Sequence, residues 1–282
     1  MVVMRFMFFV TALIPGLAFT QANAPLCPAQ HAEYFDAQKN IARYNIKKRS
    51  FIEYEIIDGK VTNESYKRKE IRYNPNGSVN EVIYVDKENV TISIIVFSYT
   101  DKGLPKSETE FYPDGNQIGR TVYRYSVKGI LQEKSDYNQY GYIISKTKYE
   151  TTNDEKIIIQ KLSSPKSVDY TIEFRFSNII HGQLLSEYRY TANNKLEMYI
   201  IYEYSGENIS KEIYYNSANQ LLYKHNFVYD ENGDNTKVLK ILTNGERRDF
   251  VINKYNNVHL LAGKMVYGPL GQTLSYIKFQ YE

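Results

Sequence analysis

One spacing limits what this chain can fold into. An aromatic residue followed by a turn recurs about every 13 residues over most of its length. Tyr73 is followed by Asn-Pro-Asn-Gly, Tyr99 by Thr-Asp-Lys-Gly and Tyr229 by Asp-Glu-Asn-Gly. Turns of this composition supply the positive φ that tight chain reversals require. The repeating unit is therefore predicted to be one strand and one turn.

We call the recurring aromatic residues anchors and expect each to end a strand. The anchors are Tyr73, Tyr99, Tyr112, Tyr125, Tyr137, Tyr149, Phe176, Tyr190, Tyr204, Tyr215, Tyr229, Tyr255, Tyr267 and Tyr281. Three double spacings each contain a degenerate anchor, at Asp86, Leu162 and Leu242. A strand of about eight or nine residues and a turn of about four or five fit each step.

Alternation inside the strands predicts which face is buried. In the run 184–190, Ser186 and Tyr188 fall on the phase of the anchor, whereas Glu187 and Arg189 fall on the other phase. The anchor phase is aliphatic or aromatic in most strands, and the other phase carries much of the Lys, Arg and Glu. We expect one aromatic face to be covered and one charged face to be solvated.

The predicted fold class is all-β: a long antiparallel meander of about 17 short strands. A flat sheet of that width is wider than a twisted open sheet tolerates, so we expect it to curl into a shell, a barrel-like form or a bent-sheet array. No Pro- or Ser-rich linker divides residues 51–282, which we interpret as a single β-repeat domain. Residues 23–50 are less regular, and the segment 37–43 is compatible with a short helix.

The N-terminus has the pattern of a secretory signal peptide. Arg5 precedes an apolar run over residues 6–19, and small residues follow, with cleavage expected after Ala22. The run is too short to be a good membrane-spanning helix. Residues 1–22 therefore predict an exported protein, located in the periplasm, at the cell surface or in the medium, with membrane contact only through the signal peptide.

Charge and cysteine content exclude several classes of function. The chain has 35 basic and 32 acidic side chains, a net charge of +3, without the one-sided basic stripe that nucleic-acid binding requires. Cys27 is the only cysteine, so an internal disulfide and a thiolate zinc site are both excluded. No cofactor and no nucleic-acid partner are expected.

The titratable residues do not form a recognisable catalytic motif. The histidines His31, His181, His225 and His259 lack metal-ligand spacing, and His225 is expected to be a hydrogen-bonded core residue. Glu108, Glu110 and Glu133 are carboxylates that we place mostly on the charged outer phase.

One turn superficially resembles a calcium loop. Asp230, Asn232 and Asp234 provide oxygen ligands, but the glycine is fourth rather than sixth and no glutamate stands at position twelve. We interpret this segment as a hairpin turn and expect no metal.

Tyrosine is the residue type that points to binding. The chain has 28 tyrosines and no tryptophan, and we expect most anchors to stack along the sheet. Tyr84, Tyr199 and Tyr214 fall off the anchor phase or beside it, so they are the predicted exposed aromatic residues for a glycan or a peptide.

A tyrosine is followed by a turn glycine and then an aliphatic residue at 73–79 (Tyr-Asn-Pro-Asn-Gly-Ser-Val), 112–118 (Tyr-Pro-Asp-Gly-Asn-Gln-Ile) and 137–143 (Tyr-Asn-Gln-Tyr-Gly-Tyr-Ile), and this pattern resembles the YD repeats of bacterial RHS-type proteins. It is also similar to the MORN-like repeats of some bacterial antitoxin-type proteins. The resemblance spans about residues 54–282. It implies a coiled antiparallel sheet and an exported location, and it transfers no functional residue.

These observations favour an exported, non-enzymatic β-repeat protein that presents a surface to a glycan, a protein or its own copies. Two alternatives remain. A carbohydrate-active hydrolase requires a cleft with two facing carboxylates. A small outer-membrane β-barrel would also show apolar and polar alternation, but its lipid face would then have to carry Lys211 and His225.

Overall fold

The computed structural model describes residues 38–152, 156–162, 169–176 and 183–282, and the segments between them are not described. The described part contains one short helix and 18 strands. They are α2 (Gln38–Arg43), β1 (Lys48–Ile57), β2 (Lys60–Tyr73), β3 (Val79–Val85), β4 (Thr91–Tyr99), β5 (Pro105–Phe111), β6 (Gln117–Tyr125), β7 (Leu131–Asn138), β8 (Ile143–Thr152), β9 (Lys156–Leu162), β10 (Tyr170–Phe176), β11 (Leu184–Thr191), β12 (Leu196–Ser205), β13 (Asn208–Asn216), β14 (Leu221–Tyr229), β15 (Asn235–Leu242), β16 (Arg247–Tyr255), β17 (Leu261–Tyr267) and β18 (Thr273–Tyr281). The predicted all-β antiparallel meander is confirmed.

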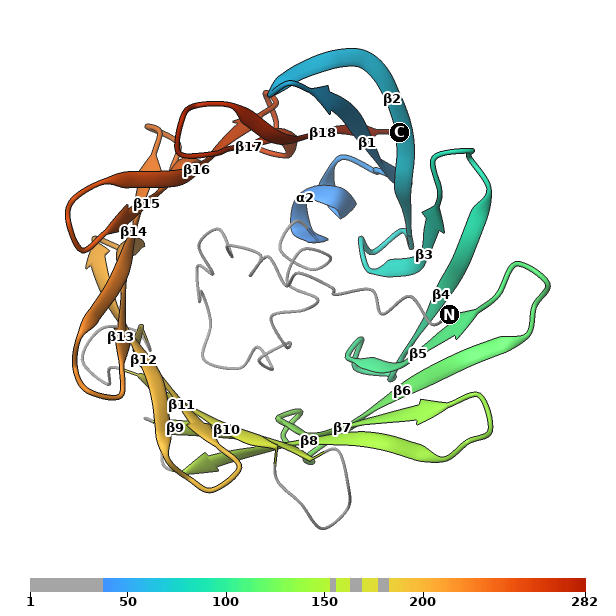
Figure 1. Cartoon of the computed structure of the whole chain (residues 1–282). Coiled ribbons are helices and arrows are strands. Elements are labelled where there is room, and N and C mark those ends of the chain that lie inside the picture. The colour runs from blue at the N-terminus through green and yellow to red at the C-terminus, as the bar shows by residue number, and fades with distance from the viewer. Residues whose placement is uncertain (1–37, 153–155, 163–168, 177–182) are drawn as a thin grey trace, which may run out of the picture.

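The strands form one sheet that returns on itself. Each strand pairs antiparallel with its neighbours in sequence, and β1 pairs with both β2 and β18. The β1–β18 pairing runs from Arg49 opposite Tyr281 to Glu53 opposite Ile277. Figure 1 shows the resulting ring of strands, with α2 on its inner side. Closure satisfies the backbone groups that two free edge strands would otherwise leave exposed.

A residue in the left-handed region closes most of the turns. In the β4–β5 turn, the amide of Gly103 donates to the carbonyl of Thr100 at 2.8 Å, and Gly103 has φ of 75°. This is the geometry of a type I turn followed by a left-handed residue that forms a bulge. In four other turns this position is taken by a residue with a side chain, namely Asn89, Asn194, Asn219 and His259.

The left-handed residue, rather than the aromatic one, sets the register of each repeat. It lies three positions after the residue whose carbonyl accepts its amide hydrogen, so Tyr112 begins the turn that Gly115 closes, and Phe111 ends β5. In the repeats with degenerate anchors, the left-handed residue likewise fixes where the turn begins. Val85 and not Asp86 ends β3, four residues before Asn89, and the turn closed by Gly245 begins with Leu242.

The predicted single aromatic face is divided between the two sides of the sheet. Glu187 in β11 pairs with Ile200 in β12, and Tyr188 pairs with Tyr199. Residues opposite each other in a strand pair lie on the same face of the sheet. Tyr188, which is in phase with the anchor of β11, therefore shares a face with Tyr199, which is out of phase with the β12 anchor Tyr204. Anchors of even-numbered strands therefore face the inside of the ring, whereas anchors of odd-numbered strands face outward. The expectation that Glu187 lies on the outer, charged face is wrong for this reason.

The largest apolar cluster lies where the ring closes. Ile41 of α2 is 1% exposed and packs with a set of inner-face residues from β1–β4 and β18. These are Phe51, Ile71, Tyr73, Val79, Val82, Phe97 and Phe279, together with Leu260 from the β16–β17 turn. Full burial of each such aliphatic or aromatic side chain contributes about 1.5–3 kcal/mol. A smaller cluster joins Phe227, Val238 and Val251 on β14–β16.

Inner-face anchors such as Tyr99 and Tyr229 tie the end of their strand to the start of the preceding one. In each case the tyrosine hydroxyl donates to the backbone carbonyl of the residue 20 positions earlier, at 2.6–2.9 Å. The pairs are Tyr99 with Val79, Tyr204 with Leu184, Tyr229 with Ile209 and Tyr281 with Leu261. Burial raises the pKa of Tyr204 and of Tyr281 to about 12, so both stay protonated donors at neutral pH.

Candidate functional site

Two neighbouring turns at one end of the ring border a hollow that is open to solvent. The β5–β6 turn and the β7–β8 turn both follow odd-numbered strands, so the meander places them at the same end. Their side chains line a hollow of about 600 Å³, which we call the turn pocket. Its lining residues are Tyr112, Asp114, Asn116, Gln117, Gln139 and Tyr140. Tyr112 is 47% exposed and Tyr140 is 73% exposed.

The turns that carry these side chains are held by their own polar groups. Asp114 Oδ1 accepts from the Asn116 amide at 2.9 Å, and Asp114 Oδ2 accepts from the Asn116 side chain at 2.8 Å. In the second turn, Asn138 Oδ1 accepts from the amides of Tyr140 and Tyr142, each at 3.0 Å. Such side-chain to backbone bonds order a turn without a tertiary partner. The pocket therefore has two ordered walls.

A glycine lets the strands beneath the pocket approach closely. Gly119 in β6 pairs with Asn138 in β7. A Cβ at this position would lie 2.9 Å from the Tyr137 carbonyl oxygen, closer than real Cβ contacts. The absent side chain allows β6 to lie against β7 next to the two turns.

The inner face of β5–β8 carries a polar network. Tyr123 donates its hydroxyl hydrogen to Glu108, which is 8% exposed. Asp136 accepts from Thr121 at 2.8 Å and from Ser145, and Lys134 Nζ lies 3.8 Å from Asp136. Burial raises the pKa of Glu108, although the Tyr123 hydrogen bond opposes the rise.

A second network occupies the inner face of β11–β14. Tyr202 donates to Glu187 at 3.3 Å. Glu212 accepts from the Tyr214 hydroxyl at 2.8 Å and lies 3.0 Å from His225 Nδ1. Burial raises the pKa of Glu187, and the nearby charge of Glu212 adds to the rise. Burial also raises the pKa of Tyr202 well above its ordinary value, so its hydroxyl remains a donor.

The two networks repeat one arrangement. In each, a glutamate of an odd-numbered strand accepts from a tyrosine 15 residues later in the next strand: Glu108 from Tyr123 and Glu187 from Tyr202. A protein interior tolerates a buried carboxylate when the carboxylate has hydrogen-bond partners. Within the described residues, no group of three or more His, Cys, Asp or Glu side chains could hold a metal ion. We interpret both networks as structural.

The carboxylates named from the sequence divide between the faces. Glu108 and Glu110 pair with Phe97 and Ile95, so both lie on the inner face and not on the predicted outer one. The reason is again the opposite phase of odd-numbered strands. Glu133 does lie on the outer face. It accepts a hydrogen bond from the Ser135 hydroxyl, and Lys146 Nζ lies 3.3 Å away. Burial alone would raise the pKa of Glu133, but these two contacts outweigh burial and lower it.

His225 is buried at 7% exposure and hydrogen-bonded to Glu212, as predicted for a core histidine.

The three tyrosines predicted to be exposed are each half-buried. Tyr84 packs against the large apolar cluster on the inner face. Tyr199 is stacked between Tyr188 and Tyr215, with ring centroids 5.5 and 4.9 Å apart. A ring whose two faces meet other rings has little area left for a ligand.

Tyr214 stacks on Tyr223 at 4.3 Å and meets the edge of His225 at 5.0 Å. Its hydroxyl is already committed to Glu212. Tyr214 therefore belongs to the inner network.

The oxygen-rich segment 230–235 forms the β14–β15 turn. Asp230 Oδ1 accepts from the amides of Asn232 and Asp234, at 2.9 and 3.0 Å. Asp234 Oδ2 lies 2.8 Å from His259 Nδ1, which joins this turn to the β16–β17 turn. The Asp230 carboxylate is therefore hydrogen-bonded within its own turn, and the Asp234 carboxylate joins two turns.

The other predicted positions are placed as follows. Tyr73, Tyr99, Tyr125, Tyr229, Tyr255, Tyr267 and Tyr281 end their strands, and Tyr137, Tyr149, Tyr190, Tyr204 and Tyr215 lie one to three residues before a strand end. Phe176 ends β10 opposite Leu184. The predicted signal peptide, Cys27, His31 and His181 lie outside the described residues.

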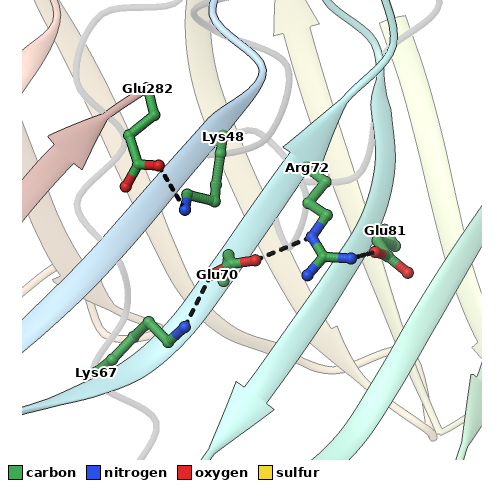
Figure 2. Close-up of polar contacts among 6 residues, drawn as sticks. All are labelled: Lys48, Lys67, Glu70, Arg72, Glu81 and Glu282. Carbon is green, nitrogen blue, oxygen red and sulfur yellow. Dashed lines mark hydrogen bonds and ion pairs between the residues drawn. The ribbon is translucent and has the colours of Figure 1, made fainter.

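Ion pairs cross the outer face near the closure. Figure 2 shows Glu70 between Lys67 and Arg72, at 2.8 and 2.9 Å, with Arg72 reaching Glu81 at 2.5 Å. Lys48 lies 2.6 Å from Glu282, which connects β1 to the residue after β18. Burial alone would raise the pKa of Glu70, but its hydrogen bonds with Lys67 and Arg72 outweigh burial and lower it.

Sequence reasoning missed the turn pocket. From the sequence, Tyr112 is expected to end a strand, and Tyr140 falls inside a turn. The usable signal was Asn-Gln-Tyr-Gly at 138–141, because a large aromatic residue inside a turn has no core to enter.

The chain was compared with known proteins. No family model matches it, and no curated protein matches it. Solved structures that match part of the chain include a porin-like protein from Bacteroides uniformis, at 11% identity over 84% of this chain and 96% of that chain, with a TM-score of 0.35. A porin-like protein from Bacteroides vulgatus matches at 11% identity over 84% of this chain and 98% of that one, with a TM-score of 0.32.

A third solved structure is TcdB2-TccC3 without its hypervariable C-terminal region. It matches at 10% identity over 83% of this chain and 17% of that one, with a TM-score of 0.29. At these TM-scores the comparisons assign no role to any residue of this chain. In the part of the chain that the structure describes, no helix has the length and apolar character needed to cross a membrane.

Proposed function

We propose that this chain is an exported, non-enzymatic binding protein that holds its partner at the turn pocket. Export rests on the signal-peptide pattern of residues 1–22. The binding role rests on one observation: two tyrosines, 47% and 73% exposed, stand beside a hollow of about 600 Å³ lined by amide side chains.

The position of the pocket supports a binding role. Binding residues are concentrated on loops that a rigid scaffold holds in place, and the two turns project from paired strands of a closed sheet. Tyrosine is enriched in recognition surfaces because its ring offers a large rigid area and its hydroxyl a polar contact. A pocket of this size lies within the range of small-molecule sites.

The lining favours binding over hydrolysis. Among the six lining residues, Asp114 is the single carboxylate, whereas glycoside hydrolysis uses two. The inner-face glutamates Glu187 and Glu212 are occupied by Tyr202, Tyr214 and His225.

The test compares the full chain, expressed with its own N-terminal segment in a bacterial host, with the double variant Tyr112→Ala, Tyr140→Ala. The immobilised proteins are exposed separately to the polysaccharide and protein fractions of a bacterial cell envelope, and self-association is measured by sedimentation velocity. We expect retention of one fraction, or self-association, in the parent chain. The double variant should lose about tenfold in affinity.

The control is Tyr142→Ala, because Tyr142 is 70% exposed in the same turn but does not line the pocket. It should bind like the parent. Release of new reducing ends from the polysaccharide would instead indicate a hydrolase. Equal binding by the parent and the double variant would move the site away from the turn pocket.

A further inference from the structure

We infer that the ligand of the turn pocket is a neutral carbohydrate, bound with its pyranose units against the rings of Tyr112 and Tyr140. This inference rests on the proposed function, because it assigns a ligand class to the same site. Three properties of the pocket support the assignment of a neutral carbohydrate: the exposed tyrosine rings, the chemistry of the amide side chains and the sign of the charge in the lining.

The side chains of Tyr112 and Tyr140 are 47% and 73% exposed. Among the described residues, neither ring is stacked on another ring or covered by a cation, in contrast to Tyr199 and Tyr214. One face of a pyranose ring presents C–H groups that carry partial positive charge, and an aromatic face carries the negative part of its quadrupole. A flat exposed ring therefore matches a sugar ring in both shape and charge.

The polar lining matches hydroxyl groups. Gln117 and Gln139 each carry an amide with two donor hydrogens and an acceptor oxygen, Asn116 keeps one donor hydrogen beside its bond to Asp114, and Asp114 adds acceptors. A sugar hydroxyl donates one hydrogen bond and accepts others, so mixed amide lining satisfies it better than donors or acceptors alone. Asp114 and Asn116 are held by their mutual bonds, which reduces the entropy lost on binding.

The charge of the pocket disfavours anionic ligands. Asp114 is the one charged residue among the six that line the pocket, and its charge is negative. A phosphate, a sulfated glycan or a uronic acid would meet like charge without a lysine or arginine in the lining. A protein partner would need a contact of about 800 Å² on each side, far more than six turn residues supply.

The experiment is isothermal titration of the full chain with defined hexasaccharides. The neutral probes are cellohexaose, maltohexaose, xylohexaose, mannohexaose and chitohexaose, and the anionic probe is hexagalacturonate. We expect at least one neutral probe to bind and hexagalacturonate to bind at least about tenfold more weakly. Asp114→Asn should narrow that difference, because it removes the negative charge and keeps an acceptor for the turn.

The variants separate ring contact from other effects. Tyr112→Ala and Tyr140→Ala should each weaken binding about tenfold, whereas Tyr140→Phe keeps the ring and should bind like the parent. Tyr142→Ala is the matched control. All variants are first checked for an unchanged thermal unfolding midpoint, which the exposure of these side chains predicts.

The outcomes distinguish the ligand class from the site. If no neutral hexasaccharide binds, while an envelope fraction is still retained and lost in the double variant, the carbohydrate assignment is wrong and the binding function stands. If the double variant changes neither assay, the proposed function fails as well. Equal binding of hexagalacturonate and a neutral probe would also overturn the inference.

Discussion

At the scale of single residues, burial decides how the inner-face glutamates respond to pH. Glu108 is 8% exposed and its pKa is raised, first by burial. A raised pKa means that the folded chain binds this proton more tightly than the unfolded chain does. The resulting stabilisation is present below the ordinary glutamate pKa and is lost as the pH rises through the raised value.

We therefore predict that Glu108→Gln stabilises the protein at pH 7 and has little effect at pH 4. Glutamine removes the buried charge and keeps an oxygen that accepts from Tyr123. Urea unfolding at both pH values measures the difference as a shift in midpoint.

Glu133→Gln provides the control with the opposite sign. Its pKa is lowered, so its contribution is present at neutral pH and is lost as the pH falls. This variant should be destabilised at pH 7. A midpoint at pH 7 that Glu108→Gln leaves unchanged would show that the buried charge has no net cost, and a lowered midpoint would show that the Glu108 carboxylate stabilises the fold.

At the scale of elements, the turns and the helix α2 are coupled through one glycine. Gly77 closes the β2–β3 turn with φ of 78°, and a Cβ there would lie 2.3 Å from the carbonyl oxygen of Gln38 in α2. Gly103 has φ of 75° in the equivalent turn, and a Cβ there would meet nothing within 4 Å. The two sites share the backbone conformation and differ in their surroundings.

We predict that Gly103→Ala costs about 1–2 kcal/mol, the cost of a left-handed conformation for a residue with a Cβ. Gly77→Ala should cost more, because α2 must move away from the turn and Ile41 then loses its place in the apolar cluster. Chemical denaturation of both variants measures the difference. Equal costs would mean that α2 contributes little to the stability of the sheet.

At the scale of the whole molecule, closure depends on the contact between the first and last strands. Phe51 of β1 and Phe279 of β18 meet edge to face, with centroids 4.9 Å apart, and Phe279 is 7% exposed. Leu274 lies in the same strand and is 50% exposed. Comparing variants of Phe279 and Leu274 therefore separates the effect of closure from the effect of changing β18 itself.

We predict that Phe279→Ala destabilises by about 3–5 kcal/mol, as expected for a buried aromatic residue. Leu274→Ala should change the free energy of unfolding by less than about 0.5 kcal/mol. Amide hydrogen exchange then locates the effect: protection should fall in β1 and β18 before it falls in the distant strands. A uniform loss of protection would instead show that the ring unfolds as one unit.

Much of this fold could be predicted because the pattern is local. The spacing of anchors and turns identified antiparallel strands and their number to within one, since turn chemistry depends on adjacent residues such as Asn76 and Gly77. The segment 37–43, which is compatible with a short helix, contains α2. The burial of His225 followed from its place between Tyr223 and Phe227.

What the sequence by itself determined is therefore the strand-and-turn unit, its antiparallel order and the chemistry of each turn. The tertiary structure decided the closure of β1 on β18, the face on which each anchor lies and the meeting of Tyr112 with Tyr140 at one pocket. The physical reason is that a turn is specified by neighbours along the chain. Ring closure and the turn pocket depend instead on pairing register and curvature summed over many strands, which no single repeat encodes.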